Sequence, residues 1–293
     1  MNAAFGRLLI ALIEATHGWS QAARTRLANV LGDLAWWLVL PRRQVALTNL
    51  RACFPHWSEA RRRQVARACF RNMARALLDH AVLARAPREV LSCYVRVEGV
   101  EHLRAQDNRP LLLIAPHFVG LNAGGVRTAM EVSGVSIYAR LRNEALDAWM
   151  RAIRGRFNAP LLIPREGFEL RAAVRAMQQG RAFYYLPDQD YGARHSIFVP
   201  FFGVPAATIP MVARLAKLTG ARVVMTVTEM TAEGYVLHIQ PPWPDFPSGS
   251  IEADTARVNR EIERWVARMP QQYLWLHKRF KTRPPGAAPL YRS

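Results

Sequence analysis

The chain has 293 residues, and 51% of them are hydrophobic, which excludes wholesale disorder and allows a sizeable core. It carries 40 Lys+Arg against 22 Asp+Glu, a formal net charge of +18 that favours anionic partners: nucleic acid, an anionic membrane surface or an acidic protein. The three cysteines, at positions 53, 69 and 93, have neither metal-ligand nor CxxC spacing, so we expect reduced thiols and no metal site.

Two apolar runs near the start, residues 3–15 and 27–40, both contain charged residues. Neither reaches the roughly 20 apolar residues that a membrane span needs. In the second run Trp36 and Trp37 lie beside the basic segment 41–43, a combination that is typical of a helix lying in a bilayer surface. A buried amphipathic helix pair is the other interpretation, and we favour membrane contact because of the net charge.

We therefore predict that residues 1–42 form amphipathic, membrane-associating helices and that residues 43–293 form one larger domain. Within the larger domain, residues 58–83 carry a helix N-cap signal at Ser58, and apolar residues then recur at helical spacing with arginines on the other face. This pattern predicts a basic amphipathic helix, whose charged face is usually solvated.

From about residue 94, short apolar runs alternate with helical stretches. We expect strands at 110–116, 135–140, 182–187, 221–229 and 235–241, and helices at 143–157, 166–180, 208–220 and 251–269. Gly180 and Gly220 stand where helix C-terminal glycines belong. The alternation predicts an α/β fold with a mostly parallel central sheet flanked by helices, and ligand sites in such sheets lie outside the carboxyl ends of the strands.

His117 stands at such a strand end. Pro116 ends the first expected strand, and residues 123–132 can form the helix that follows. Asn122 comes five positions after His117, and two residues so far apart in one helix point in different directions. Their side chains can therefore meet only at a strand-to-helix junction, which is what the pattern predicts here.

The segment from His117 to Asn122 resembles the H-x4-D/E box of the bacterial lipid A biosynthesis acyltransferases, the late acyltransferases within the wider lysophospholipid acyltransferase group. Segments 43–55, 186–192, 196–208 and 272–284 also match this family in order, so the resemblance covers nearly the whole chain. It implies that 43–293 is the acyltransferase domain. It also implies transfer of a fatty acyl group from acyl carrier protein to a hydroxyl of a lipid A precursor, at the cytoplasmic face of the cell inner membrane. No cofactor and no nucleic acid partner is expected.

The residues support this chemistry independently. Acyl transfer to a hydroxyl needs a base for the hydroxyl proton and hydrogen-bond donors for the tetrahedral oxyanion. His117 fits the first role, and the helix start at 120–124 or a nearby arginine fits the second. No Ser or Cys nucleophile stands in a comparable setting, so we predict direct transfer without an acyl-enzyme intermediate.

The chain departs from the family at Asn122, where the family carries Asp or Glu. An amide oxygen can accept a bond from the imidazole but supplies no charge. Asn122 orients His117 in one interpretation, and Asp188 or Asp190, at the end of the strand expected at 182–187, partners it in another. A third interpretation is a low-activity or non-catalytic lipid-binding relative. We expect an active enzyme and assign all four residues to the catalytic group.

Three further groups of residues are predicted to bind substrate. Polar residues near strand ends suit an anionic headgroup, an apolar segment suits an acyl chain, and a basic C-terminal stretch suits lipid phosphates or an acidic carrier protein. The plainer interpretations are chance arginines, a core-facing strand and turn, and a solvated tail. An ornithine lipid or a lysophospholipid is an alternative acceptor. The headgroup residues are Arg140, Asn143 and Arg165, and the acyl-chain residues are Phe198, Phe201 and Phe202. The residues of the basic C-terminal stretch are Lys278 and Arg279.

Overall fold

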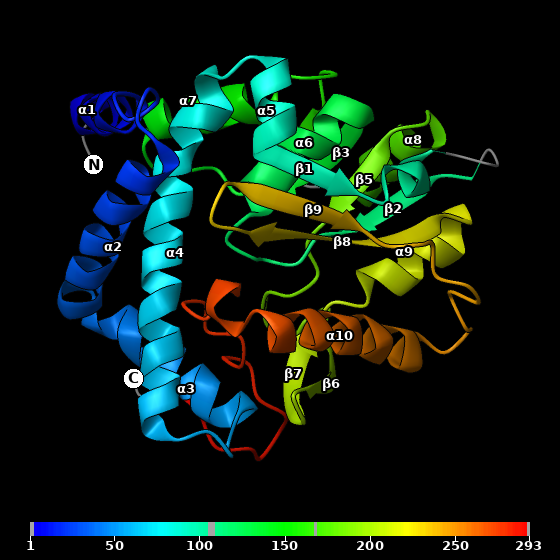
Figure 1. The fold of residues 1–293 in the computed structure, drawn as a ribbon. Coiled ribbons are helices and arrows are strands. Elements are labelled where there is room, and N and C mark those ends of the chain that lie inside the picture. The colour runs from blue at the N-terminus through cyan, green and yellow to red at the C-terminus, as the bar shows by residue number, and fades with distance from the viewer. Residues whose placement is uncertain (1–2, 105–108, 167–168, 292–293) are drawn as a thin grey trace.

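A computed structural model of the chain describes residues 3–104, 109–166 and 169–291, and it consists of a layer of N-terminal helices packed against an α/β unit (Figure 1). Serine side chains begin two of the helices in the N-terminal layer, because the Oγ atoms of Ser20 and Ser58 accept backbone N–H groups of the first turns. The helix start predicted at Ser58 is therefore confirmed. The helices of this layer are α1 (Ala3–Glu14), α2 (Gln21–Leu38), α3 (Leu40–Cys53), α4 (Glu59–Arg85) and α5 (Arg88–Tyr94).

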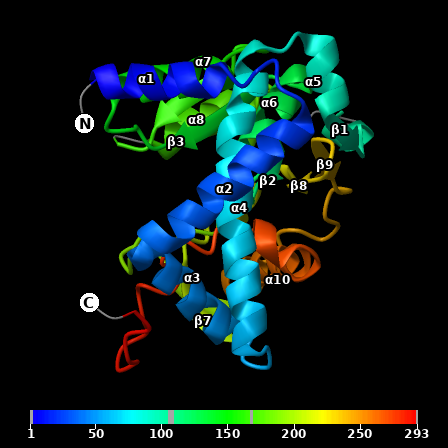
Figure 2. The ribbon, with the colours of Figure 1, turned by 60° about the vertical axis from the view of Figure 1, so that its left-hand side comes forward.

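Helix α2 crosses α4 at close range (Figure 2). Gly32 permits this approach, since a Cβ at that position would lie 2.4 Å from the Cα of Arg71. A buried ion pair joins the same two helices, with Arg24 Nε 3.2 Å from Asp79 Oδ1. The hydroxyl of Tyr235 donates to Asp79 Oδ2 at 2.9 Å, so the network also ties the helical layer to the sheet.

The central sheet has seven strands in the order β1-β9-β8-β2-β5-β3-β4. Five of them run parallel to one another, while β9 is antiparallel to β8 and β1 follows the direction of β9. The predicted α/β fold with a mostly parallel sheet is confirmed. The strands are β1 (Val95–Glu98), β2 (Leu111–Ile114), β3 (Gly134–Tyr138), β4 (Leu161–Pro164), β5 (Ala182–Tyr185), β8 (Arg222–Met230) and β9 (Tyr235–Ile239).

In the part of the chain that the structure describes, five helices flank the sheet, and a separate two-stranded hairpin packs against the last of them (Figure 1). The predicted helix ends at Gly180 and Gly220 are confirmed, with positive φ values of 83° and 65°. The flanking helices are α6 (Leu121–Glu131), α7 (Glu144–Arg154), α8 (Leu170–Gln178), α9 (Met211–Thr219) and α10 (Ile251–Arg268), and the hairpin consists of β6 (Ile197–Phe201) and β7 (Val204–Thr208).

The two N-terminal apolar runs form α1 and α2, and the boundary predicted at residue 42 falls within the first turn of α3. Within the described ranges, no helix combines the length and the apolar character that crossing a bilayer requires. The two adjacent tryptophans face different surroundings: Trp36 is 7% exposed and packs in the core, whereas Trp37 is 64% exposed. Both helices leave apolar side chains on the surface, namely Phe5, Leu8 and Leu12 on α1, and Val30, Leu31, Leu34, Trp37 and Leu38 on α2.

Candidate active site

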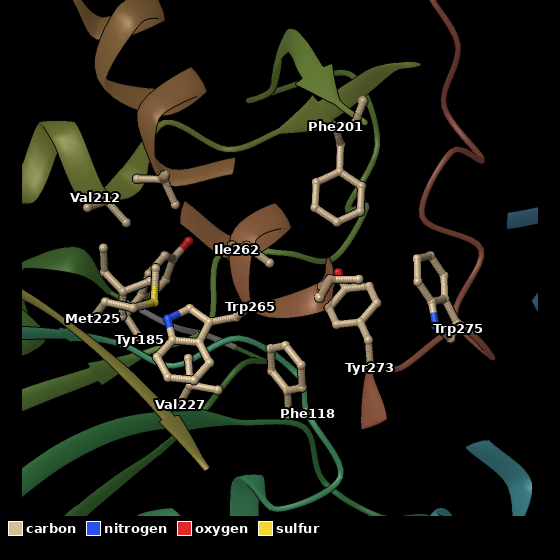
Figure 3. Close-up of a cluster of buried hydrophobic side chains, with 14 of the residues drawn as sticks. Phe118, Tyr185, Phe201, Val212, Met225, Val227, Ile262, Trp265, Tyr273 and Trp275 are labelled. Carbon is tan, nitrogen blue, oxygen red and sulfur yellow. The ribbon is translucent and has the colours of Figure 1, made fainter. Parts of the chain in front are cut away.

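The turn that carries His117 is held by the C-terminal segment of the chain. The N–H of Leu274 donates to the carbonyl of His117 at 3.0 Å, and the N–H of Val119 donates to the carbonyl of Gln272 at 2.8 Å. The rings of Phe118 and Tyr273 meet edge to face at 5.5 Å within the buried cluster of Figure 3. The backbone on both sides of the imidazole is therefore fixed by contacts that are distant in sequence.

Asp188 contacts His117 twice. Its Oδ2 accepts the backbone N–H of His117 at 2.9 Å, and its Oδ1 lies 2.7 Å from the ring Nδ1. The sheet register explains the meeting: Ile114 of β2 pairs with Tyr185 of β5, and each functional residue comes three positions after its strand partner. With only 2% of its surface exposed, Asp188 is a buried anchor for both the turn and the ring.

This contact fixes the tautomer of the neutral imidazole. A carboxylate accepts only, so Nδ1 carries a proton, and in the neutral ring Nε2 is the atom that keeps a lone pair. The Nε2 atom lies 3.0 Å from the amide nitrogen of Gln189, which donates to it. Burial raises the pKa of Asp188, but the charge and hydrogen bonds of His117 outweigh burial, so this pKa lies below its ordinary value. Asp188 is therefore a carboxylate at neutral pH.

A cavity of about 560 Å³ opens beside the imidazole. Its wall is formed by α6, β3, β4 and β5, and most of the lining surface is apolar. It extends from His117 and Gln189 past Gly125 to Val132 and Gly134 at the far end of α6. A slot of this size and polarity suits a hydrocarbon chain.

Asn122 lines the same cavity but turns away from the imidazole. Its Oδ1 accepts from Nε and Nη2 of Arg154 at 3.2 and 3.1 Å. The interpretation in which Asn122 orients His117 therefore disagrees with the structure, because Asp188 already occupies Nδ1. Burial lowers the pKa of Arg154 below its ordinary value, and the charge of Asp147 offsets only part of that effect.

Asp190 is also placed away from the imidazole. Its Oδ2 accepts the backbone N–H of Thr282 at 2.6 Å, and its Oδ1 accepts the Thr282 hydroxyl at 2.8 Å. Its own N–H donates to Nε2 of His277 at 3.1 Å. Burial and the neighbouring charge of His117 lower the pKa of His277 to about 4. Asp190 therefore anchors the C-terminal segment, and it does not touch His117.

The predicted headgroup residues have three different placements. Arg165 lines the cavity mouth, with its guanidinium 5.7 Å from the ring centre of Tyr191. Arg140 is exposed and follows Ala139, which lines the cavity. Asn143 is buried, and its Oδ1 accepts the N–H of Leu146 at 3.1 Å as the N-cap of α7. The expectation that Asn143 faces a headgroup is therefore wrong, because the side chain caps a helix.

The expectation that Phe198, Phe201 and Phe202 contact an acyl chain is also wrong. Phe201 is fully buried against Tyr273 and Phe280 in the core, and Phe202 occupies the hairpin turn and packs on Phe54. Phe198 is half-buried on β6. In the parts of the chain that the structure describes, none of the three phenylalanines lines the cavity.

The basic C-terminal stretch is divided between surface and interior. Lys278 is exposed, with its Nζ 5.6 Å from the ring centre of Tyr291. Arg279 is only 2% exposed and donates to the carbonyl of Ala207 at 2.7 Å and to the Thr208 hydroxyl at 2.8 Å. Direct phosphate binding by Arg279 is thus contradicted by its burial, although its charge helps to lower the pKa of Asp188.

A family model described as bacterial lipid A biosynthesis acyltransferase matches residues 8–282. The chain belongs to this family. It is accordingly an acyltransferase.

Three relatives from Escherichia coli (strain K12) are similar over most of their length. The lipid A biosynthesis lauroyltransferase is 33% identical over 91% of this chain and 88% of its own. The palmitoleoyltransferase is 35% identical over 90% and 87%, and the myristoyltransferase is 30% identical over 89% and 82%.

Among solved structures, the 1-acyl-sn-glycerophosphate acyltransferase of Thermotoga maritima aligns with a TM-score of 0.39 and 13% identity, over 86% of this chain and 99% of that one. That similarity is too low to bear on function.

Sequence reasoning on this acyltransferase did not identify two residues beside the site, Arg154 and Gln189. Arg154 carried no local signal among 40 Lys+Arg, since its pairing with Asn122 depends on how α7 packs on α6. Gln189 stands between the two aspartates that the sequence did single out, so its contact with Nε2 of His117 was the easier one to find.

Proposed function

We propose that this acyltransferase moves a fatty acyl group from acyl carrier protein to a hydroxyl of a lipid A precursor, with His117 as general base. The observation that carries the proposal is the buried Asp188 carboxylate on Nδ1 of His117, 2.7 Å away, beside a largely apolar cavity. Membership of the lipid A acyltransferase family supports the lipid acceptor.

The reaction follows from the tautomer of His117 in which Nε2 holds the lone pair. Nε2 of His117 removes the proton of the acceptor hydroxyl while its oxygen attacks the thioester carbonyl. The tetrahedral intermediate collapses with cleavage of the C–S bond, and the imidazolium returns the proton to the departing thiolate. Asp188 remains ionised throughout and stabilises the imidazolium. Gln189 yields its place at Nε2 to the acceptor hydroxyl.

Two features support stabilisation of the oxyanion. Helix α6 begins at Leu121, four residues after His117, so the N-terminal end of its dipole lies close to the reacting atoms. Arg154 brings a guanidinium into the lining of the same cavity. Both supply positive potential where negative charge develops on the carbonyl oxygen.

Direct transfer fits the surroundings of the nucleophilic side chains. Burial raises the pKa of the Cys69 thiol to about 12, and its Sγ donates to the carbonyl of Tyr273. In the described ranges no cysteine lines the cavity. Ser136 does line it, but its hydroxyl donates to the carbonyl of Ile137 at 3.5 Å. Among the described residues, the side chains bonded to the His117 ring are Asp188 and Gln189, so no hydroxyl–imidazole pair supports an acyl-enzyme.

The position of α1 supports contact with a membrane surface, which we place at the cytoplasmic face of the inner membrane. Phe5, Leu8 and Leu12 form an exposed apolar stripe on this helix. Gly6 on the opposite face packs on Asn143, close in sequence to Ala139 of the cavity lining. A bilayer against α1 would thus lie near the cavity, where a lipid acceptor can enter from the membrane.

The proposal is tested by incubating the full chain with labelled acyl carrier protein in detergent micelles and identifying the product by mass. The acceptors are a lipid A precursor, an ornithine lipid and a lysophospholipid. We expect transfer to the lipid A precursor, loss of transfer in His117→Ala, and normal transfer in the control His56→Ala, whose side chain is exposed and does not line the cavity. Transfer to another acceptor alone, or an active His117→Ala variant, would refute it.

A further inference from the structure

A second groove, of about 660 Å³, lies between α2, the start of α3 and the N-terminal half of α4. Among the residues that the structure describes, none lines both this groove and the cavity beside His117. Two indoles and four guanidinium groups dominate the lining, and we call it the arginine–tryptophan groove. These residues are Trp36, Trp37, Arg43, Arg63, Arg67 and Arg71.

The groove carries a surplus of positive charge. Asp33 accepts two hydrogen bonds each from Arg67 and Arg71, at 2.6 to 2.8 Å, so one carboxylate meets two guanidinium groups. The hydrogen bonds of Arg71 and Arg67 hold the pKa of Asp33 well below its usual range. The Arg63 side chain is 67% exposed, and its contact with Glu59 is long, at 3.9 Å. An anion is the complement of such a site.

The two tryptophans add aromatic faces to the positive charge of the groove. The guanidinium of Arg43 lies 5.3 Å from the ring centre of Trp36 and 5.6 Å from that of Trp37, which keeps a cation in place over two aromatic faces. The exposed indole of Trp37 continues along α2 into an apolar rim. The rim consists of Val30, Leu34, Leu38, Val39 and Leu40, each between 41% and 70% exposed.

We propose that the arginine–tryptophan groove binds the headgroup phosphate of an anionic phospholipid, while the apolar rim meets its acyl chains. The inference rests on the membrane association proposed above, and it adds a second contact, between α2 and α4, with a headgroup class and a site. Basic residues beside interfacial tryptophans match an anionic bilayer surface in charge and in polarity. An acidic carrier protein matches only the charge, and no described residue of the groove also lines the cavity in which its thioester has to react.

The experiment compares two charge-reversal variants of the full chain. Arg43→Glu/Arg63→Glu alters the groove, while Arg214→Glu/Arg260→Glu makes the same change in net charge on exposed positions of α9 and α10. Sedimentation measures binding to vesicles of phosphatidylcholine with and without phosphatidylglycerol, at one ionic strength. We expect the groove variant to lose tenfold or more of the phosphatidylglycerol-dependent binding and the control to lose less than about threefold.

A second measurement separates a headgroup site from general surface charge. Dihexanoyl-phosphatidylglycerol below its micelle concentration should bind the wild-type chain and the control variant but not the groove variant, and dihexanoyl-phosphatidylcholine should bind none of them. Equal loss in both variants, or a groove variant that loses carrier-protein binding and keeps vesicle binding, would overturn the inference. Acyl transfer in micelles should persist in both variants, so failure of this inference is distinguishable from failure of the proposed function.

Discussion

Replacing Asn122 by Asp separates two accounts of the cavity. In this chain the Asn122 oxygen lies 3.2 and 3.1 Å from Nε and Nη2 of Arg154, whereas Nδ1 of His117 is held by Asp188. A carboxylate at position 122 would therefore pair with the guanidinium and leave the imidazole unchanged. We expect kcat to stay within about tenfold of wild type.

The same substitution should affect stability. Exchanging two neutral-acceptor bonds for charge-assisted ones adds about 1 kcal/mol to the free energy of unfolding, as measured in urea. Asn122→Leu is the matched control, and it should lower that free energy by about 1–3 kcal/mol because Arg154 loses its acceptor. Were Asn122 the partner of His117, restoring the carboxylate would raise kcat by as much as about 10⁴. A gain of several hundredfold would refute the geometry.

Three further predictions address the cavity and the C-terminal anchor. A Cβ at Gly125 would lie 3.9 Å from Tyr184 Cε1, so the Gly125→Leu variant should fold and its side chain should fill the cavity. Competition assays across acyl chain lengths should then show a preference for shorter chains, at about 0.8 kcal/mol per excluded CH₂. The pKa of His277 is about 4 when folded and near 6.5 when unfolded, so the free energy of unfolding should fall as pH drops from about 6.5 to 4. The His277→Gln variant should lose most of this pH dependence, and an unchanged pH dependence would contradict the low pKa assigned to His277. Asp190→Asn should lower the free energy of unfolding by about 1–3 kcal/mol through its bonds to Thr282, with kcat of the folded enzyme within tenfold; a collapse of kcat without a loss of stability would contradict that role.

The strand-to-helix junction at His117 was predictable because its signals are local. An apolar run, a Pro–His turn and an amphipathic segment stand next to one another in the sequence, and they became β2, the turn and α6. The choice between Asn122, Asp188 and Asp190 was not local. It depends on the pairing of Ile114 with Tyr185, which single-strand patterns do not encode.

The misassigned residues show the limit of composition. Phe201 and Arg279 were assigned to substrate from apolar and basic character, but both are buried together, with the guanidinium 5.5 Å from the phenyl ring centre. Apolar or basic character alone does not tell which way a side chain faces once the hairpin packs on α10 and the tail packs on the hairpin. Asn143 likewise had the composition of a polar site residue and the position of a helix cap.

The central claim is that Asp188 holds His117 as a general base, and the kcat of Asp188→Asn tests it most directly. The substitution keeps the shape but removes the charge and the preference for a proton on Nδ1. We expect kcat to fall by about 10³–10⁴, close to the value for His117→Ala, while Asp190→Asn keeps near-normal turnover. An Asp188→Asn enzyme within tenfold of wild type, alongside an inactive His117→Ala, would contradict the account.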